Sequence, residues 1–171
     1  MSTVILKWNP SFSSYPMFGY LQELRALTND EETDFNWSVW DHEKIDIGDK
    51  LYWVKLGYGQ TGIVASGRVT SKPYLGKDWS GKNRETYYVD FELDIMINPD
   101  TLPILTNEEL SREIPDFDWA KGHSGLVLNE QQAEKLDALW QKFIERNKDF
   151  WQKAINARYK DQLWMAKAKK A

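Results

Sequence analysis

Residues 51–70, LYWVKLGYGQTGIVASGRVT, contain the clearest strand signals of the sequence. Residues 51–56 and 63–70 are rich in β-branched and aromatic side chains and have the length of strands. The connection at 57–62 holds three glycines, which adopt the backbone conformations of a tight turn without steric cost. These residues therefore predict two strands joined in a hairpin.

The glycines of this connection, Gly57-x-Gly59-x-x-Gly62, also match the dinucleotide-binding fingerprint as a string. That fingerprint needs a helix after the glycines, because the helix N-terminus holds the pyrophosphate. A predicted strand follows here, so we interpret the glycines as a hairpin loop.

Further elements are predicted on both sides of the hairpin. Residues 3–8 read as a strand that ends at Asn9-Pro10, because proline lacks an N–H and restricts the residue before it. Residues 17–27 place apolar side chains at the spacing of one helix face. Apolar and acidic residues alternate along 89–95, which is typical of a strand with one buried face. The chain is thus predicted to mix strands and helices.

Two capping boxes predict helix starts. Thr106-Asn107-Glu108-Glu109 opens a short helix that Pro115 ends, and Asn129-Glu130-Gln131-Gln132 opens the longest periodic stretch. There the apolar residues keep a helical period almost to the C-terminus, through Leu163 and Trp164. A helix of about 35 residues would be about 50 Å long, so we expect it to project, break near Asn147 or pack on another chain.

Composition limits the class of protein. A chain of 171 residues with 42% hydrophobic and 28% charged residues is typical of one globular domain. The absence of cysteine excludes disulfides, thiolate metal sites and a cysteine nucleophile. No apolar run approaches the roughly 20 residues needed to cross a bilayer, so we expect a cytoplasmic protein with no membrane contact.

Few residue patterns indicate catalysis. Asp90, Glu92 and Asp94 share one strand face and could hold a divalent cation if another element added ligands, although a solvated face is the simpler interpretation. The two histidines, His42 and His123, show no paired metal-binding spacing. Gly122-His123-Ser124-Gly125 is not the elbow that presents a nucleophilic serine, and a polar loop at a pocket rim is favoured.

Aromatic residues are the most informative signal, because nine Trp, eight Tyr and seven Phe make up 14% of the chain. Trp37 and Trp40 flank Ser38 and Val39 and follow Asn36, shortly before the hairpin. Trp8 and Phe12 lie near the end of the first strand and Trp53 lies within the second. Aromatic faces hold nucleobases by stacking, while amides and hydroxyls read their edges. These residues could form an aromatic cage, or two or three of the tryptophans could simply belong to the core.

The net charge of −4 argues weakly against nucleic acid, but charge is unevenly distributed. Five cations, with Tyr74 and Trp79 among them, form a segment suited to a phosphate backbone: Arg68, Lys72, Lys77, Lys82 and Arg84. Such a segment more commonly forms a loop exposed to solvent.

The order of these segments resembles the EVE and ASCH branches of the PUA-like superfamily. The resemblance covers residues 3–128 and is carried by VILKWNP (4–10), Trp37, Gly48-Asp49, GIVASGRV (62–69) and Pro73-Tyr74. It implies a small bent β-barrel flanked by helices, with a pocket that in related domains accepts a modified base in DNA or RNA. Val39-Trp40 stand where EVE domains have a characteristic Arg-Asn pair, and the C-terminal helix lies outside the match.

We therefore predict an α+β protein with a PUA-like domain at 1–128 and a long amphipathic helix with a Lys-rich tail at 129–171. We expect it to bind nucleic acid through a modified base, without a cofactor or metal and without catalysis of its own. The expected ligand-binding residues are Trp8, Asn9, Asn36, Trp37, Ser38, Trp40, Trp53, His123 and Ser124. The alternatives are a metal-dependent nuclease or base-processing enzyme built on 90–94, and a module that binds a partner or a second copy through its C-terminal helix.

Overall fold

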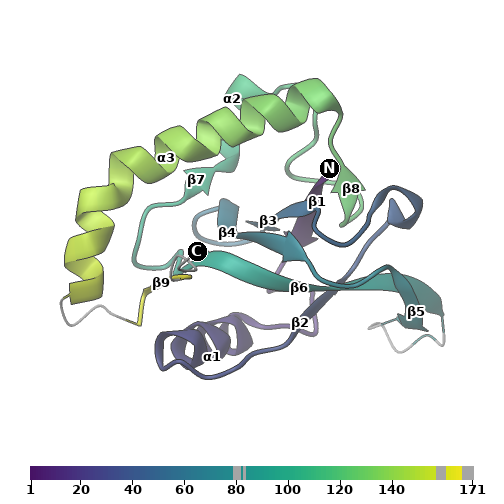
Figure 1. The fold of residues 1–171 in the computed structure, drawn as a ribbon, viewed down its shortest axis with the longest axis horizontal. Helices are drawn as coiled ribbons and strands as arrows, with labels where there is room; N and C mark the ends of the chain where they lie inside the picture. Colours follow the sequence, from purple (N-terminus) through teal and green to yellow (C-terminus); the bar gives the residue numbers. More distant parts are fainter. Residues whose placement is uncertain (79–81, 83, 157–160, 167–171) are drawn as a thin grey trace.

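A curled sheet of nine strands is the centre of the computed structural model, which describes residues 1–78, 82, 84–156 and 161–166 (Figure 1). The main strand order is β2-β6-β4-β3-β1-β8, while β5 and β9 also pair with β6 and β7 pairs with β4. Only β1 and β3 pair in parallel among these described strands. The strands are β1 (Thr3–Trp8), β2 (Phe35–Ser38), β3 (Lys50–Lys55), β4 (Gly62–Val69), β5 (Tyr74–Lys77), β6 (Glu85–Ile97), β7 (Leu105–Thr106), β8 (Leu126–Val127) and β9 (Leu163–Met165).

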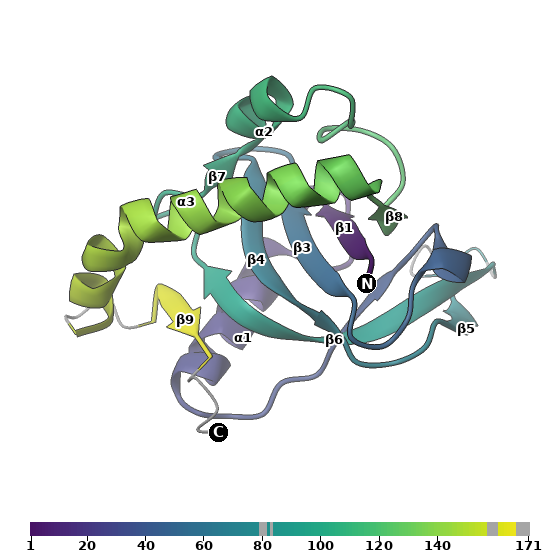
Figure 2. The ribbon, with the colours of Figure 1, turned by 45° about the horizontal axis from the view of Figure 1, so that its top comes forward.

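The predicted hairpin is present as β3 and β4, which pair antiparallel. The register shifts between Trp53 and Val54, and again between Ser66 and Gly67 where β4 meets β6. Such irregularities bend a strand and increase its twist. At the second one the chains are so close that a Cβ atom on Gly67 would lie 1.9 Å from the carbonyl oxygen of Glu92. The sheet therefore curls toward a half-barrel (Figure 2).

Two helices cover opposite faces of the sheet, α1 (Met17–Thr28) on one and α3 (Glu130–Asn156) on the other (Figure 1). Consecutive residues of β3 show the two layers: the Tyr52 ring packs against Trp140 of α3, and the Trp53 ring packs against Tyr20 of α1. Because both faces are covered, every residue of β1 is buried. The core thus lies on both sides of the central strands.

Both predicted helix starts are confirmed, and the second has the two reciprocal bonds of a capping box. The Thr106 hydroxyl accepts a hydrogen bond from the Glu109 N–H at the start of α2 (Asn107–Glu113). Before α3, the Asn129 side chain accepts from the Gln132 N–H at 2.8 Å, and the Gln132 side chain accepts from the Asn129 N–H at 2.9 Å. A short 3₁₀ helix at His42–Lys44 completes the helices of the described chain.

The C-terminal helix differs from its prediction. It passes Asn147 without a break, bends over its last turns (Figure 1) and ends at Asn156, which gives a length of about 40 Å along its axis at 1.5 Å per residue. Leu163 and Trp164, which continued the helical period in the sequence, belong instead to β9 and pair with β6. The prediction of helix over these two residues is therefore wrong.

The apolar face of α3 is buried in its own domain, through Leu136, Trp140, Phe143 and Trp151. Packing on a second chain is thus not needed to cover this face. Among the described helices, none combines the length and hydropathy required to span a membrane. The predicted Lys-rich tail at 167–171 and Trp79 lie outside the described residues.

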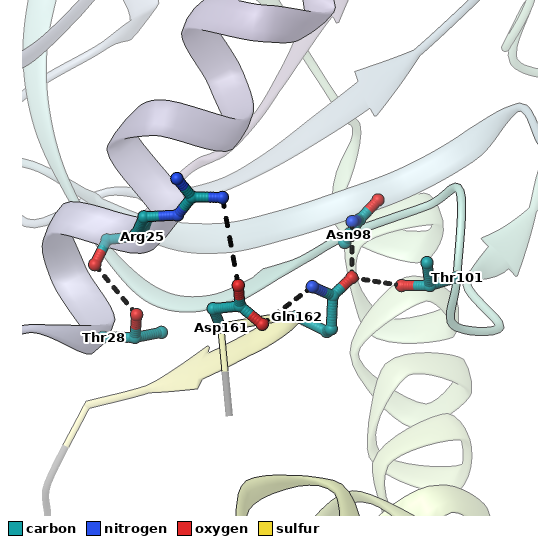
Figure 3. Close-up of polar contacts among 6 residues, drawn as sticks. All are labelled: Arg25, Thr28, Asn98, Thr101, Asp161 and Gln162. Atoms are coloured by element: carbon teal, nitrogen blue, oxygen red, sulfur yellow. Dashed lines mark hydrogen bonds and ion pairs between the residues drawn. The ribbon is translucent and has the colours of Figure 1, made fainter. Parts of the chain in front are cut away.

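Polar contacts hold the chain after α3 against the sheet and α1 (Figure 3). The Gln162 side-chain oxygen accepts hydrogen bonds from Asn98 Nδ2 and Thr101 Oγ1, both at 2.6 Å. The neighbouring Asp161 carboxylate lies 4.0 Å from the Arg25 guanidinium of α1. The approach to β9 is therefore fixed from two sides.

Candidate functional site

A cavity of about 570 Å³ lies beside α1, β1, β2 and β3. All but one of the residues predicted to bind a ligand line it: Trp8, Asn9, Asn36, Trp37, Ser38, Trp53, His123 and Ser124. Trp40 is the exception. We call this space the aromatic cavity, because the rings of Trp8, Tyr15, Trp37 and Trp53 form its wall.

The four rings pack as one cluster. Trp53 lies 5.6 Å from Trp8 and 5.3 Å from Trp37 between ring centroids, and Tyr15 stacks on Trp53 at 5.7 Å with an interplanar angle of 14°. Tyr15 also meets Trp37 edge to face at 5.7 Å. Spacings and angles of this kind are typical of favourable aromatic pairs.

Hydrogen bonds fix two of these indoles to the backbone. Trp37, on β2, donates through Nε1 to the Lys7 carbonyl at 3.1 Å, and Trp8, the last residue of β1, donates through Nε1 to the Tyr15 carbonyl at 2.6 Å. The second bond also holds the loop between β1 and α1 against the cavity. The wall is therefore preorganised by contacts between segments far apart in the sequence.

The aromatic side chains of the cavity differ in their exposure to solvent, and this difference indicates which of them could stack on a ligand. Trp8 and Trp53 are each 1% exposed, whereas Trp37 is half-buried and Phe12, at the rim, is 79% exposed. One face of Trp53 is already covered by Tyr15, so Trp53 forms the floor of the cavity and offers little free surface for stacking. Trp37 is the predicted ring that combines a place in the wall with access from solvent.

The rim is polar. The Ser124 hydroxyl accepts a hydrogen bond from the Lys7 N–H at 2.9 Å, and His123 is exposed beside it. Trp40 stacks on His123 with ring centroids 3.7 Å apart and an interplanar angle of 4°. Trp40 thus contacts a rim residue from outside the cavity rather than lining it.

Lys7 was not predicted, although it organises the same rim. It is buried, and its ammonium group donates to the carbonyls of Asp118 and Lys121, in the segment that leads to His123. Burial lowers the pKa of the Lys7 ammonium, an effect that the nearby Asp118 carboxylate partly opposes. A lysine within the otherwise apolar run VILKW was the one sequence signal for this role.

Tyr15 and Glu23 were also missed, because nothing in the sequence marks a loop tyrosine or one glutamate of a helix as part of a cavity. Glu23 lines the aromatic cavity from α1, and burial raises the pKa of its carboxyl group, an effect that the nearby Tyr15 phenol partly opposes. Burial also raises the pKa of the Tyr15 phenol, and the nearby Glu23 adds to that shift. The cavity therefore combines aromatic faces with a carboxyl and a phenol that are partly withdrawn from water.

The predicted cations lie in two places. Lys72, Lys77, Lys82 and Arg84 are exposed in and around the hairpin formed by β5 and β6. Tyr88 of β6 lines the aromatic cavity, which places this hairpin beside it. Arg68 of β4 instead donates to the Gly48 carbonyl at 3.2 Å and lines a second cavity of about 590 Å³.

Acidic side chains dominate that second cavity, which is lined by Glu31, Glu32, Asp34, Glu92 and Asp94. The alternation of β6 is confirmed, because Asp90, Glu92 and Asp94 are exposed between buried apolar residues. No group of three or more histidine or carboxylate side chains suited to a metal ion occurs among the residues that the structure describes.

No protein-family model and no curated protein matches the sequence. Solved structures are similar in fold. A hypothetical protein from Leishmania major aligns with a TM-score of 0.53 and 13% identity over 83% of this chain and 96% of that one. Human THYN1, in complex with DNA that contains 5-methylcytosine, aligns with a TM-score of 0.52 and 12% identity over 81% and 97%.

A protein from Pseudomonas syringae aligns with a TM-score of 0.50 and 13% identity over 80% of this chain and 98% of that one. In each case nearly the whole neighbour is covered, so the likeness includes the complete fold of that neighbour. Together with the curled mixed sheet and the flanking helices, these matches show that the chain shares the α+β fold of these proteins, the kind of fold that the resemblance to the PUA-like superfamily implied.

Proposed function

We propose that this protein binds nucleic acid by accepting one unpaired, modified base in the aromatic cavity. The observation that carries the proposal is the convergence of Trp8, Tyr15, Trp37 and Trp53 on one space of about 570 Å³. That volume is within the range of small-molecule sites, about 300–1,000 Å³.

Trp37 supplies the stacking surface in this proposal. Stacking of a base on an aromatic side chain is worth about 1–3 kcal/mol. Asn36, Ser38 and His123 lie around the same space and offer an amide, a hydroxyl and an imidazole for contacts with the base edge. Because a base enters such a cavity only after it leaves the stack, a single-stranded or flipped base is the expected ligand.

Two further observations support nucleic acid as the ligand. Human THYN1 shares the fold and was solved with DNA that contains 5-methylcytosine. The exposed cations Lys72, Lys77 and Arg84 lie in and beside the hairpin next to the cavity. The phosphates on either side of a base bound in the cavity would pass there.

Binding of short single-stranded oligonucleotides, with and without 5-methylcytosine or N6-methyladenine, tests the proposal by calorimetry. Trp37→Ala should weaken binding of the preferred strand by about 5- to 150-fold, the equivalent of 1–3 kcal/mol. Phe150→Ala removes an exposed aromatic ring from α3, away from the cavity, and should leave binding unchanged.

Circular dichroism and thermal unfolding establish that both variants are folded before binding is compared. The proposal fails if the wild-type protein binds none of the strands, or if Trp37→Ala binds them as tightly as Phe150→Ala does.

A further inference from the structure

Unpartnered polar atoms are concentrated at the aromatic cavity. Among the described residues, five buried side-chain nitrogen or oxygen atoms have no hydrogen-bond partner, and three belong to residues that line this one cavity. They are Tyr15 Oη, Glu23 Oε2 and Trp53 Nε1. The Tyr15 hydroxyl lies close enough to the Glu23 carboxyl to affect its pKa, so these two groups face the same part of the cavity. Since buried polar groups are nearly always paired in folded proteins, such a concentration indicates that a partner is supplied from outside the chain.

Glu23 is the most unusual of the three. It follows Tyr20 by three residues and precedes Leu24, so it lies toward the side of α1 that faces the sheet, where the other helix residues are apolar. Within the described part of the chain no ion pair involves it. A half-buried carboxylate without a cation reduces stability, and sites that break the apolar pattern in this way are often functional.

The chemistry of a carboxylate limits what it can recognise. An ionised carboxylate only accepts hydrogen bonds, and its terminal torsion is soft enough to turn either oxygen toward the cavity. The exocyclic amino groups of cytosine and adenine donate N–H, and one N–H remains after a single methylation of the amino group. Uracil and thymine present a carbonyl oxygen at the equivalent position, which a carboxylate repels.

From this arrangement we infer that Glu23 is a specificity-determining residue, which accepts a hydrogen bond from the exocyclic amino group of a base stacked on Trp37. The cavity then selects amino-bearing bases of the cytosine and adenine type over uracil and thymine. This inference rests on the proposed function, because it names the class of base that the same cavity accepts.

Tyr15 and Trp53 fit the same interpretation. The Tyr15 hydroxyl both donates and accepts, and Trp53 Nε1–H only donates, so together with Glu23 they offer both kinds of partner to one base edge. Burial raises the pKa of the Glu23 carboxyl and the neighbouring Tyr15 hydroxyl opposes that shift only in part, which is consistent with a carboxylate that gains further donors when a ligand binds.

The test compares bases of nearly equal shape. Each strand has seven nucleotides, with a base only at the central position. That base is 5-methylcytosine or thymine, two bases that differ at C4, which carries an amino group or a carbonyl oxygen, and at N3. The wild-type protein should bind the 5-methylcytosine strand at least ten-fold more tightly. Glu23→Gln keeps the shape but offers both a donor and an acceptor, so this ratio should fall close to one while thymine binds as well as before or better.

Adenine and hypoxanthine strands repeat the comparison for a purine. Glu134→Gln changes a glutamate of α3 that does not line the cavity and should keep the wild-type ratio. If the wild-type protein binds the strands but does not distinguish the two members of either pair, or if Glu23→Gln keeps the wild-type ratio, the role of Glu23 is refuted and base binding stands. If no strand binds at all, the proposed function and the role of Glu23 fail together.

Discussion

Two buried lysines on adjacent strands allow the rim of the aromatic cavity to be tested against a matched control. Lys7 of β1 donates to the carbonyls of Asp118 and Lys121. Lys55 of the parallel strand β3 donates to the carbonyls of Tyr58 and Gln60, in a loop that does not line the cavity. Each lysine thus fixes one loop through the same chemistry, but only Lys7 holds the segment that leads to His123.

Methionine at either position keeps most of the length of the unbranched side chain and removes the donors. Loss of two hydrogen bonds from a charged group to loop carbonyls costs about 1–3 kcal/mol, because the carbonyls must find water. Burial lowers the pKa of both lysines, which shows that the buried ammonium is itself unfavourable. Methionine avoids that penalty, so we expect a cost in the lower half of the range, about 1–2 kcal/mol, and a fall in Tm of about 2–8 °C for either variant.

Binding should separate the two variants. Lys7→Met frees the 118–124 segment and should weaken binding of a methylated strand several-fold, whereas Lys55→Met should leave it unchanged. Thermal unfolding, and calorimetry at a temperature well below both transitions, check the two effects independently. Equal affinity of Lys7→Met and Lys55→Met for the strand would refute a role for Lys7 in holding the rim.

Three further outcomes are expected. Gly67→Ala should destabilise the fold by more than about 3 kcal/mol in urea unfolding, because its Cβ would lie 1.9 Å from a carbonyl oxygen of β6. Glu23→Gln should raise Tm at pH 8 but hardly at pH 4. The pKa of the Glu23 carboxyl is raised in the folded state, so the wild-type protein loses stability as the pH rises above the ordinary pKa of glutamate, whereas at low pH the carboxyl is protonated in the folded and the unfolded protein alike. Replacing Lys72, Lys77 and Arg84 together by Ala should make binding less sensitive to salt. The slope of log Kd against log salt concentration should fall by about 0.7 for each phosphate that these cations neutralise. Salt titrations of the wild-type protein and the triple variant measure the two slopes.

The sequence was sufficient to predict those parts of the fold that depend on residues close together in the chain. The glycines at 57–62 and the Asn129–Gln132 capping box act locally, and both predictions are confirmed. The end of α3 could not be predicted in this way. Leu163 and Trp164 are apolar at helical spacing, yet a short apolar run fits a strand equally well, and pairing with β6 decides the outcome.

The candidate site shows the same division. Trp8, Trp37 and Trp53 were found because aromatic residues are conspicuous in a sequence, and they converge on one cavity. Tyr15 and Glu23 became visible only when the loop before α1 and the inner face of that helix were brought to the same place. A polar residue becomes unusual through its surroundings, which the sequence does not contain.

The position of β1 between β3 and β8 has a consequence for how a ligand enters. β3 pairs with the whole of β1, and β8 pairs with Val4 and Ile5. Both strands are distant in the sequence, so the amides of Val4 and Ile5 should exchange with deuterium only when the whole molecule unfolds. Trp8 is the last residue of that strand and is 1% exposed, so we expect this part of the cavity wall to stay fixed while the molecule is folded. The half-buried Trp37 and the exposed His123 already leave the rim accessible to solvent, and we expect faster local motion in the segment at 9–16, whose amides should exchange orders of magnitude sooner.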